Sequence, residues 1–203
     1  MRSSSSTTSR TPPPARFRRR TCATGSRTTR LPEVAIRPAR RHDAQAIAAI
    51  YAWHVANGTA TFDTAAPDAA FWQEKLADFA ARGLPFLVAE LEGRVVAYAY
   101  AARFRDRAAY AHTCEDSIYV SHEARGEGIG SVLLPALIDA ARVSGFQQML
   151  AVVGGGEPAS VALHTKCGFV HAGRMRNVGK KFGRLLDTVY MQCDLTGEGW
   201  DNE

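Results

Sequence analysis

The chain of 203 residues has the length of one domain, and with 46% hydrophobic and 22% charged residues it has the composition of a globular protein. It contains no run of about 18 apolar residues, so we expect no membrane span, and its four cysteines form neither a CxxC pair nor a zinc-ligand pattern, which favours a reduced, cytoplasmic protein without a metal. The net charge of +5 arises in the first 30 residues, which hold eight arginines and no acid, so the remainder carries a charge of −3.

The N-terminal extension, residues 1–33, is rich in Ser, Thr, Pro and Arg. It holds too few apolar residues to form a core, so we expect it to be disordered. Three interpretations stay open for it: an organelle transit peptide, an arm that binds nucleic acid, or an extension without function. The composition favours the third, so nucleic acid is not an expected partner. We expect one folded domain at residues 34–196 and a C-terminal tail at residues 197–203.

Hydrophobic periodicity predicts a mixed α/β domain. In chain order the predicted elements are a strand at 34–37, helices at 43–55 and 68–83, strands at 86–90, 95–102 and 113–120, a helix from 130 to about 142, a strand at 148–153, a helix at 158–167 and a strand at 185–194. Asp43 and Asp68 are predicted N-caps of the first two helices, because a carboxylate at that position accepts hydrogen bonds from unpaired helical N–H groups. Phe71 is predicted to face the core.

A glycine-rich loop, Arg125-Gly126-Glu127-Gly128-Ile129-Gly130, follows the predicted strand at 113–120 and opens the next helix. Glycines let a ligand approach the backbone, and N–H groups converge where a helix begins, so the loop suits an anion such as a pyrophosphate. A plain turn between a strand and a helix is the alternative. The loop is not a P-loop, because no Gly-Lys-Ser/Thr follows, and it lacks the position and the acidic partner of a dinucleotide fingerprint.

The same loop, Arg125 to Gly130, resembles motif A of the GNAT superfamily of acetyltransferases. The segments Val34–Arg40, Glu115–Ser121 and Ser160–Phe169 are similar to the family's opening strand, the strand that lines acetyl-CoA and the end of the cofactor cleft. Phe182–Asp187 resembles a segment of the phosphinothricin and methionine sulfoximine/sulfone acetyltransferases. The resemblance implies a single α/β domain with a mixed, splayed sheet flanked by helices, acetyl-CoA as co-substrate, an amino-acid-like substrate, a homodimer and a role in detoxification.

The resemblance assigns two groups of residues to the cofactor: a strand whose backbone pairs with the pantetheine arm, and the loop that cradles the pyrophosphate. The assigned residues are Ile118, Tyr119, Val120, Arg125, Gly126, Glu127, Gly128, Ile129, Gly130, Ser131, Glu157 and Lys166. Lys166 reaches a phosphate in this interpretation, and a solvated lysine is the alternative. Glu157 stands where the family usually has Asn, and a carboxylate can only accept hydrogen bonds from pantetheine. The run Gly154-Gly155-Gly156 is expected to loosen the edge of the cleft.

Glu115 is the candidate general base implied by the resemblance, since a carboxylate acting through water could take the proton of the substrate amine. Holding the substrate or pairing with an arginine is its alternative role. His164 stands where many members have Tyr near the departing sulfur, and an imidazolium could protonate the thiolate; a structural histidine is the alternative. Cys114 alternates to the opposite face of its strand from Glu115, so we expect no covalent enzyme intermediate.

The loop Arg105-Asp106-Arg107 is the candidate for substrate recognition, because an arginine fork suits a carboxylate; a solvated charged loop is the alternative. Asp116 and Ser117 are adjacent candidates, and Phe62 is either an apolar wall of the substrate site or a core aromatic. The expected reaction is direct attack of the amino group of an amino-acid-like molecule on acetyl-CoA. Another amine, a protein N-terminus or a CoA-binding module without catalysis are the alternatives.

Overall fold

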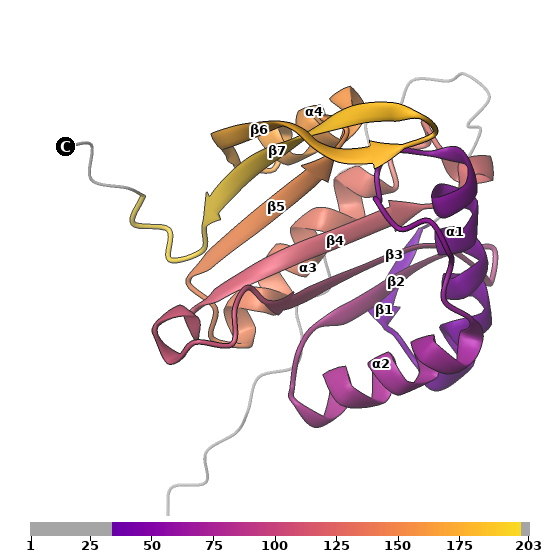
Figure 1. The fold of residues 1–203 in the computed structure, drawn as a ribbon. Helices are drawn as coiled ribbons and strands as arrows, with labels where there is room; N and C mark the ends of the chain where they lie inside the picture. The colour runs from indigo at the N-terminus through magenta and orange to yellow at the C-terminus, as the bar shows by residue number, and fades with distance from the viewer. Residues whose placement is uncertain (1–33, 200–203) are drawn as a thin grey trace, which may run out of the picture. The chain divides into compact units, whose positions relative to one another are not determined.

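The computed structural model describes residues 34–199, and the predictions for the extension at 1–33 lie outside the described residues. Within this part of the chain, seven strands form one mixed sheet in the order β1-β2-β3-β4-β5-β7-β6 (Figure 1). The strands are β1 (Ala35–Pro38), β2 (Phe86–Leu91), β3 (Arg94–Arg103), β4 (Thr113–Val120), β5 (Gln148–Gly154), β6 (Val170–Lys181) and β7 (Arg184–Asp194). The helices are α1 (Ala44–Asn57), α2 (Ala69–Ala81), α3 (Gly130–Val143) and α4 (Pro158–Lys166). The predicted mixed α/β sheet is confirmed.

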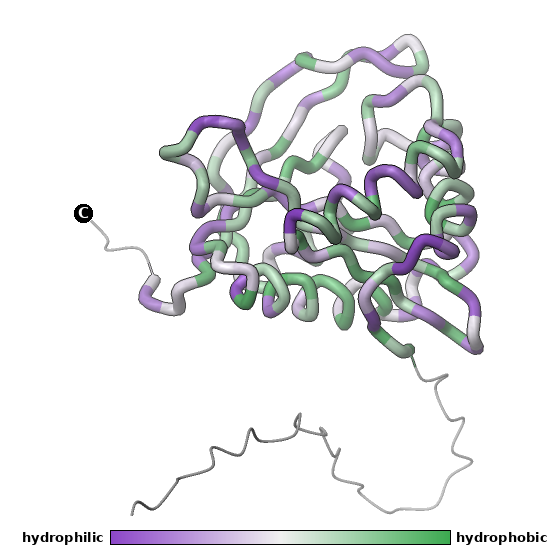
Figure 2. Tube along the Cα trace, turned by 90° about the horizontal axis from the view of Figure 1, so that it is seen from below, coloured by the Kyte–Doolittle hydropathy of each residue, from purple (hydrophilic) through white to green (hydrophobic). Residues whose placement is uncertain are grey.

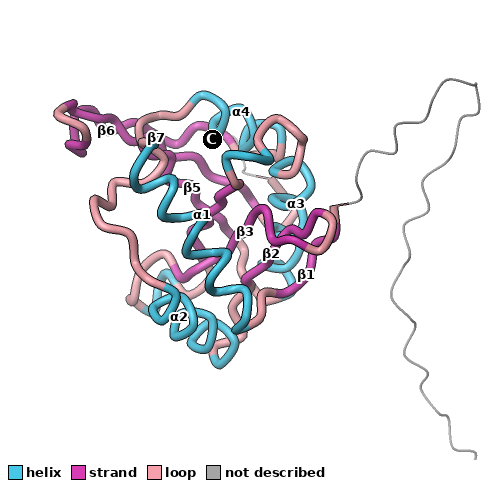
Figure 3. Tube along the Cα trace, turned by 90° about the vertical axis from the view of Figure 1, so that its right-hand side faces the viewer, coloured by secondary structure: helices cyan, strands magenta, loops and turns pink. Residues whose placement is uncertain are grey.

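The helices cover both faces of the sheet, with α1 and α2 on one face and α3 on the other (Figures 1 and 3). Hydrophobic and hydrophilic residues alternate along the helices, as expected for helices that turn one side to a sheet (Figure 2). Two separate hydrophobic clusters result. The cluster of α3 includes Leu133, Leu134 and Leu137, whereas α1 and α2 enclose an aromatic cluster around Trp72 and Tyr98. No helix among the described residues is long and apolar enough to span a membrane.

The two predicted N-caps have different outcomes. Asp68 accepts a hydrogen bond from the backbone N–H of Phe71 at 3.0 Å, so this cap is confirmed. Asp43 precedes α1 but makes no capping bond, because its carboxylate accepts instead from the Arg37 guanidinium and from the backbone N–H of Arg40. The inward orientation expected for Phe71 is wrong, since this side chain is 47% exposed.

β4 and β5 diverge along their length. They are the only parallel neighbours in the described sheet, and they pair only from Thr113 opposite Gln148 to Glu115 opposite Leu150. β5 continues to pair with β7 as far as Gly154. The last five residues of β4 therefore turn an unpaired edge toward β5, which makes the sheet splayed in the way that the resemblance implied.

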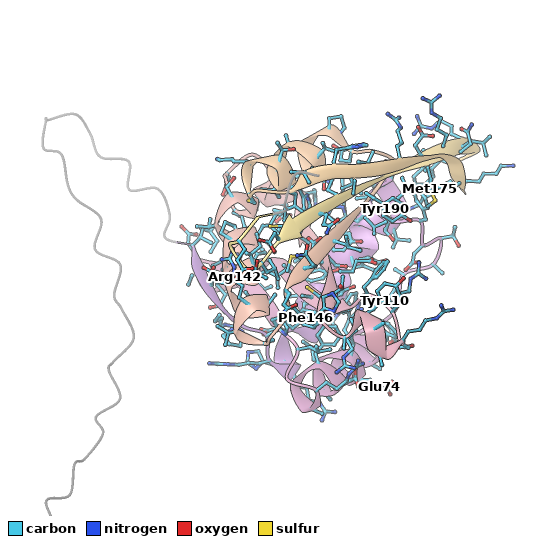
Figure 4. The ribbon with its side chains drawn as sticks, turned by 90° about the vertical axis from the view of Figure 1, so that its left-hand side faces the viewer. Glu74, Tyr110, Arg142, Phe146, Met175 and Tyr190 are labelled. Atoms are coloured by element: carbon cyan, nitrogen blue, oxygen red, sulfur yellow. The ribbon has the colours of Figure 1, made fainter. Side chains whose placement is uncertain are left out.

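The sequence predicted one last strand, but the described chain ends in a long hairpin of β6 and β7. β6 was missed because nearly all of its residues are exposed, so its sequence carries no apolar alternation. Its register against β7 shifts between Met175 and Gly179, which marks an irregularity in the ladder. Met175 lies on the projecting part of this hairpin (Figure 4).

Candidate active site

Two cavities lie where β4 and β5 diverge. The smaller, of about 270 Å³, is lined mainly by the facing edges of β4 and β5, and we call it the strand cavity. The larger, of about 680 Å³, is lined by the glycine-rich loop and the ends of α1, α3 and α4, and we call it the loop cavity. Four residues line both cavities: Ala60, Ile118, Glu157 and Ser160. The two cavities are therefore adjacent parts of one site.

The backbone of β4 supplies hydrogen-bonding groups to this site. Just beyond β4, the N–H of Ser121 donates to the carbonyl of Val96 beside β3 at 2.7 Å. Because alternate residues of a strand turn their backbone groups to opposite edges, Tyr119 also faces β3, whereas Ile118 and Val120 face the gap. The backbone groups available to pair with an extended ligand are thus those of Ile118 and the N–H of Val120, because the Val120 carbonyl oxygen lies 2.9 Å from His54 Nε2. Those of Tyr119 are already used within the sheet.

The glycine-rich loop shapes the wall of the loop cavity. Gly126 and Gly128 have φ values of +81° and +77°, a conformation that glycine adopts far more readily than other residues. A Cβ on Gly130 would lie 2.9 Å from the Leu163 side chain, so glycine also allows the start of α3 to approach α4. These three glycines and Arg125 line the cavity at the N-terminus of α3, where backbone N–H groups favour an anion.

A buried pair of side chains forms the floor of the strand cavity. His164 Nε2 lies 3.1 Å from Asp116 Oδ2, and both residues are at most 6% exposed. The other ring nitrogen, Nδ1, lies 2.7 Å from the carbonyl of Ser160. Burial lowers the pKa of His164, but the hydrogen bond and charge of Asp116 outweigh it, so the net pKa is raised. Both ring nitrogens face acceptors, which suits a protonated imidazolium that has no N–H left over for another partner.

Glu115 lines the same cavity from the other face of β4. No side chain among the described residues hydrogen-bonds to its carboxylate. Burial raises the pKa of Glu115, the charge of Asp116 raises it further, and Arg105 partly opposes the change. Its neighbour Cys114 lies in the core beneath α3, where burial raises the pKa of the thiol to about 12. A partly desolvated carboxylate beside a cavity can accept a proton, whereas the buried thiol is inert.

The remaining predicted substrate residues divide into two groups. Phe62 and Ser117 line the strand cavity. Arg105, Asp106 and Arg107 are exposed in the loop between β3 and β4 and line neither cavity, although the charge of Arg105 acts on Glu115. On the cofactor side, Ile129, Ser131 and Glu157 line the loop cavity, whereas Glu127 and Lys166 do not.

The glycine run after β5 was expected to loosen the cleft, but the structure shows close packing there. A Cβ on Gly154 would lie 2.8 Å from the carbonyl oxygen of Thr59, and one on Gly155 would lie 2.6 Å from the Thr59 hydroxyl. The segment before α2 is therefore held tightly against the end of β5. Phe62 belongs to this segment, and its ring packs against Gly179 of β6.

One histidine of this site was not predicted from the sequence. His54 lies on α1 with the spacing of a core residue, and it is only 5% exposed. It nevertheless lines the loop cavity together with Trp53, and its ring contacts both β4 and Arg125. Nothing in the spacing along α1 separates this histidine from its apolar neighbours, so only the three-dimensional arrangement reveals it.

The splayed sheet, the open edge of β4 and the glycine-rich loop at the start of α3 define an acetyl-CoA-dependent N-acetyltransferase of the GNAT class. A family model described as an acetyltransferase (GNAT) domain matches residues 36–190, and the chain belongs to this family. The resemblance stated from the sequence is thereby confirmed.

Two individual relatives and one solved structure are similar to this chain over most of their length. The chain is 46% identical over 161 residues to a phosphinothricin N-acetyltransferase of Alcaligenes faecalis, a match that covers 79% of this chain and 82% of the relative. It is 40% identical to an L-methionine sulfoximine/L-methionine sulfone acetyltransferase of Pseudomonas aeruginosa, over 79% and 94% of the two chains. The crystal structure of a phosphinothricin acetyltransferase from Sinorhizobium meliloti in complex with AcCoA superposes with a TM-score of 0.79 at 44% identity, covering 84% of this chain and 92% of that one.

Acetyl-CoA is therefore the co-substrate, and the residues present fit it. The unpaired edge of β4 suits the amide-rich pantetheine arm, and the loop cavity offers an anion site of sufficient size beside it. Among residues 34–199, no cluster of three or more His, Cys, Asp or Glu side chains is arranged to hold a metal ion.

Proposed function

We propose that this enzyme transfers the acetyl group of acetyl-CoA to the amino group of a small amino-acid-like substrate of the phosphinothricin, methionine sulfone or methionine sulfoximine type. The observation that carries the proposal is the strand cavity, where the Glu115 carboxylate lies beside the open edge of β4. A volume of about 270 Å³ suits a small molecule. The names of the two relatives supply the substrate class.

Proton removal is the task that we assign to Glu115. An amino group is largely protonated at neutral pH and must lose a proton before it can attack a carbonyl carbon. The raised pKa of Glu115 makes its carboxylate a better proton acceptor, acting directly or through one water. When bound, acetyl-CoA supplies the activated acyl thioester, and we propose that the free amine attacks it directly.

The backbone N–H of Val120 is our candidate for stabilising the oxyanion that forms during the attack. It faces the gap between β4 and β5. The Val120 carbonyl oxygen lies 2.9 Å from His54 Nε2, so the N–H is the group of this residue that remains for a ligand. A fixed backbone donor costs no reorganisation when negative charge develops beside it.

His164 is our candidate acid for the departing thiolate. Its raised pKa favours the protonated state, but both N–H groups already face protein acceptors. Donation to sulfur therefore requires that the Nε2–H turns from Asp116 to the ligand. We propose that Asp116 holds this proton in place until the thiolate forms.

Recognition of the substrate carboxylate is assigned to Arg105 and Arg107. Guanidinium groups bind carboxylates through paired hydrogen bonds, and Arg105 is close enough to Glu115 to influence its pKa. A polyamine would need acidic residues, and this loop contains only Asp106. This arrangement favours an amino acid over a polyamine.

A homodimer is also part of the proposal. The β6–β7 hairpin projects from the described sheet and exposes apolar side chains, namely Met175, Val178, Phe182 and Leu185. Exposed apolar residues grouped on one element are typical of an interface between chains. A cytoplasmic location, which the free cysteines favour, and a role in detoxification, which the proposed substrates imply, belong to the same proposal.

The experiment follows CoA release with a thiol reagent. Purified enzyme is mixed with acetyl-CoA and with methionine sulfone, phosphinothricin or spermidine. Turnover of either amino-acid analogue that is lost in Arg105→Ala, but kept in a control variant of the exposed Arg94→Ala, supports the assignment. Turnover with spermidine alone would overturn it.

A further inference from the structure

The Arg125 guanidinium is held in the loop cavity by an aromatic stack. It lies over the Trp53 ring at 4.5 Å from the ring centroid, and Trp53 also stacks with His122, whose ring lies 4.8 Å away at an interplanar angle of 2°. Arg125 Nη2 also lies 3.4 Å from His54 Nδ1. The stack and the histidine together restrict the orientation of this positive charge.

The hydrogen bonds of His54 define its tautomer. Nε2 lies 2.9 Å from the carbonyl oxygen of Val120, and a carbonyl can only accept, so the proton is on Nε2. Nδ1 then carries the lone pair and accepts from the Arg125 N–H. Burial and the neighbouring charges of Arg125, His122 and Lys181 lower the pKa of His54, and together they outweigh the hydrogen bond to Val120, which raises it, so the neutral ring is favoured.

We infer that His54 is a positioning residue for the cofactor, which ties the Arg125 guanidinium to the end of β4 so that it meets the phosphates of CoA. The inference rests on the binding of acetyl-CoA in the loop cavity and not on the identity of the amine. The His54 ring makes two contacts that bear on the cofactor. It holds the Arg125 guanidinium beside the glycine-rich loop, and it hydrogen-bonds to the Val120 carbonyl, so that the N–H of Val120 is the group left to face the gap.

Two substitutions separate the two hydrogen bonds. In His54→Gln the side-chain amide can still donate to the Val120 carbonyl, but no acceptor remains at the position of Nδ1. In His54→Asn the amide oxygen can take the position of Nδ1 and accept from Arg125, while the bond to Val120 is lost. Arg125→Gln removes the charge itself, and His54→Gln/Arg125→Gln completes a double-mutant cycle.

The measurement is the dissociation constant of CoA, by calorimetry without any amine, alongside that of pantetheine, which lacks the phosphates. We expect His54→Gln to weaken CoA binding about tenfold, comparable to one charge-assisted hydrogen bond, while pantetheine binding changes by less than about twofold. His54→Asn should keep more of the CoA affinity than His54→Gln. The double variant should bind CoA no more weakly than Arg125→Gln.

Three results would overturn the inference. Multiplicative effects of His54→Gln and Arg125→Gln would mean that His54 does not act through the arginine. An equal loss of affinity for pantetheine and CoA would indicate a general structural role. Wild-type CoA affinity in a folded His54→Gln protein, verified by circular dichroism, would show that the bond to Arg125 has no effect. Failure of the substrate assignment leaves all these measurements unaffected.

Discussion

The Phe62 ring, which lines the strand cavity, packs directly against Gly179 and fits there only because this residue has no Cβ. A Cβ on Gly179 would lie 2.8 Å from Cζ of the Phe62 ring and closer still to the edge atoms, so Gly179→Ala forces the ring to move. Overpacking of this kind typically costs about 1–3 kcal/mol. For a chain of this size, that cost corresponds to a fall in melting temperature of about 2–12 °C.

The displaced ring also affects catalysis, because Phe62 lines the strand cavity. The neighbouring Thr59 is packed tightly against Gly154 and Gly155, so the segment that carries Phe62 cannot shift in that direction to relieve the clash. We expect Gly179→Ala to raise the KM of the amine more than that of acetyl-CoA. The assay combines thermal unfolding with steady-state kinetics for both substrates.

Gly173→Ala is the matched control, since it lies on the same strand and a Cβ there meets nothing within 4 Å. It should change neither quantity measurably. Equal melting temperatures and equal KM values for Gly179→Ala and Gly173→Ala would refute the idea that Gly179 positions Phe62.

Three further predictions concern other parts of the chain. The raised pKa of His164 means that its protonation stabilises the fold. This contribution to the free energy of unfolding is fully present below the unfolded pKa of about 6.5 and is lost as pH rises through the folded pKa. The difference in free energy of unfolding between wild type and His164→Asn, measured with urea, should therefore be larger at pH 6 than at pH 9. Arg37→Ala should destabilise the fold by about 2–4 kcal/mol, because it strands the buried Asp43 carboxylate, whereas Arg82→Ala, which breaks an exposed ion pair, should cost less than about 1 kcal/mol in the same assay. Glu157→Asn should tighten CoA binding about three- to fivefold in calorimetry, since an amide can both donate and accept where a carboxylate only accepts; unchanged or weaker binding would contradict this reasoning.

The sequence predicted well those elements whose burial leaves a periodic pattern. Helices α1 to α3 and the inner strands β2 to β5 have apolar faces, and the glycine-rich loop carries a fixed spacing of residues, so both were found. β6 was missed because exposed residues dominate it. The cap assigned to Asp43 failed for a different reason: a distant partner, Arg37 on β1, competes for the carboxylate.

In the site, too, residues within one motif could be predicted from the sequence, whereas contacts between distant residues could not. Glu115 and Asp116 could be named because they belong to a motif in one strand. The bond of Asp116 to His164, the contact of His54 with Arg125 and the packing of Phe62 on Gly179 each join residues far apart in the chain. Spacing along one element cannot reveal such contacts, because they depend on how the elements pack.

Removal of the proton from the substrate amine by Glu115 is tested most directly by a pH–rate profile. Acetyl transfer to methionine sulfone is measured from pH 6 to pH 10 for wild type, for Glu115→Gln and for a control variant of Glu74→Gln, an exposed residue on α2 (Figure 4). We expect Glu115→Gln to lower kcat/KM about 10²–10⁴-fold at neutral pH, the usual contribution of a general base. The loss should narrow at high pH, where the amine gives its proton to solvent, and the control should follow wild type. A Glu115→Gln enzyme that keeps wild-type kcat/KM at every pH would show that Glu115 does not remove this proton.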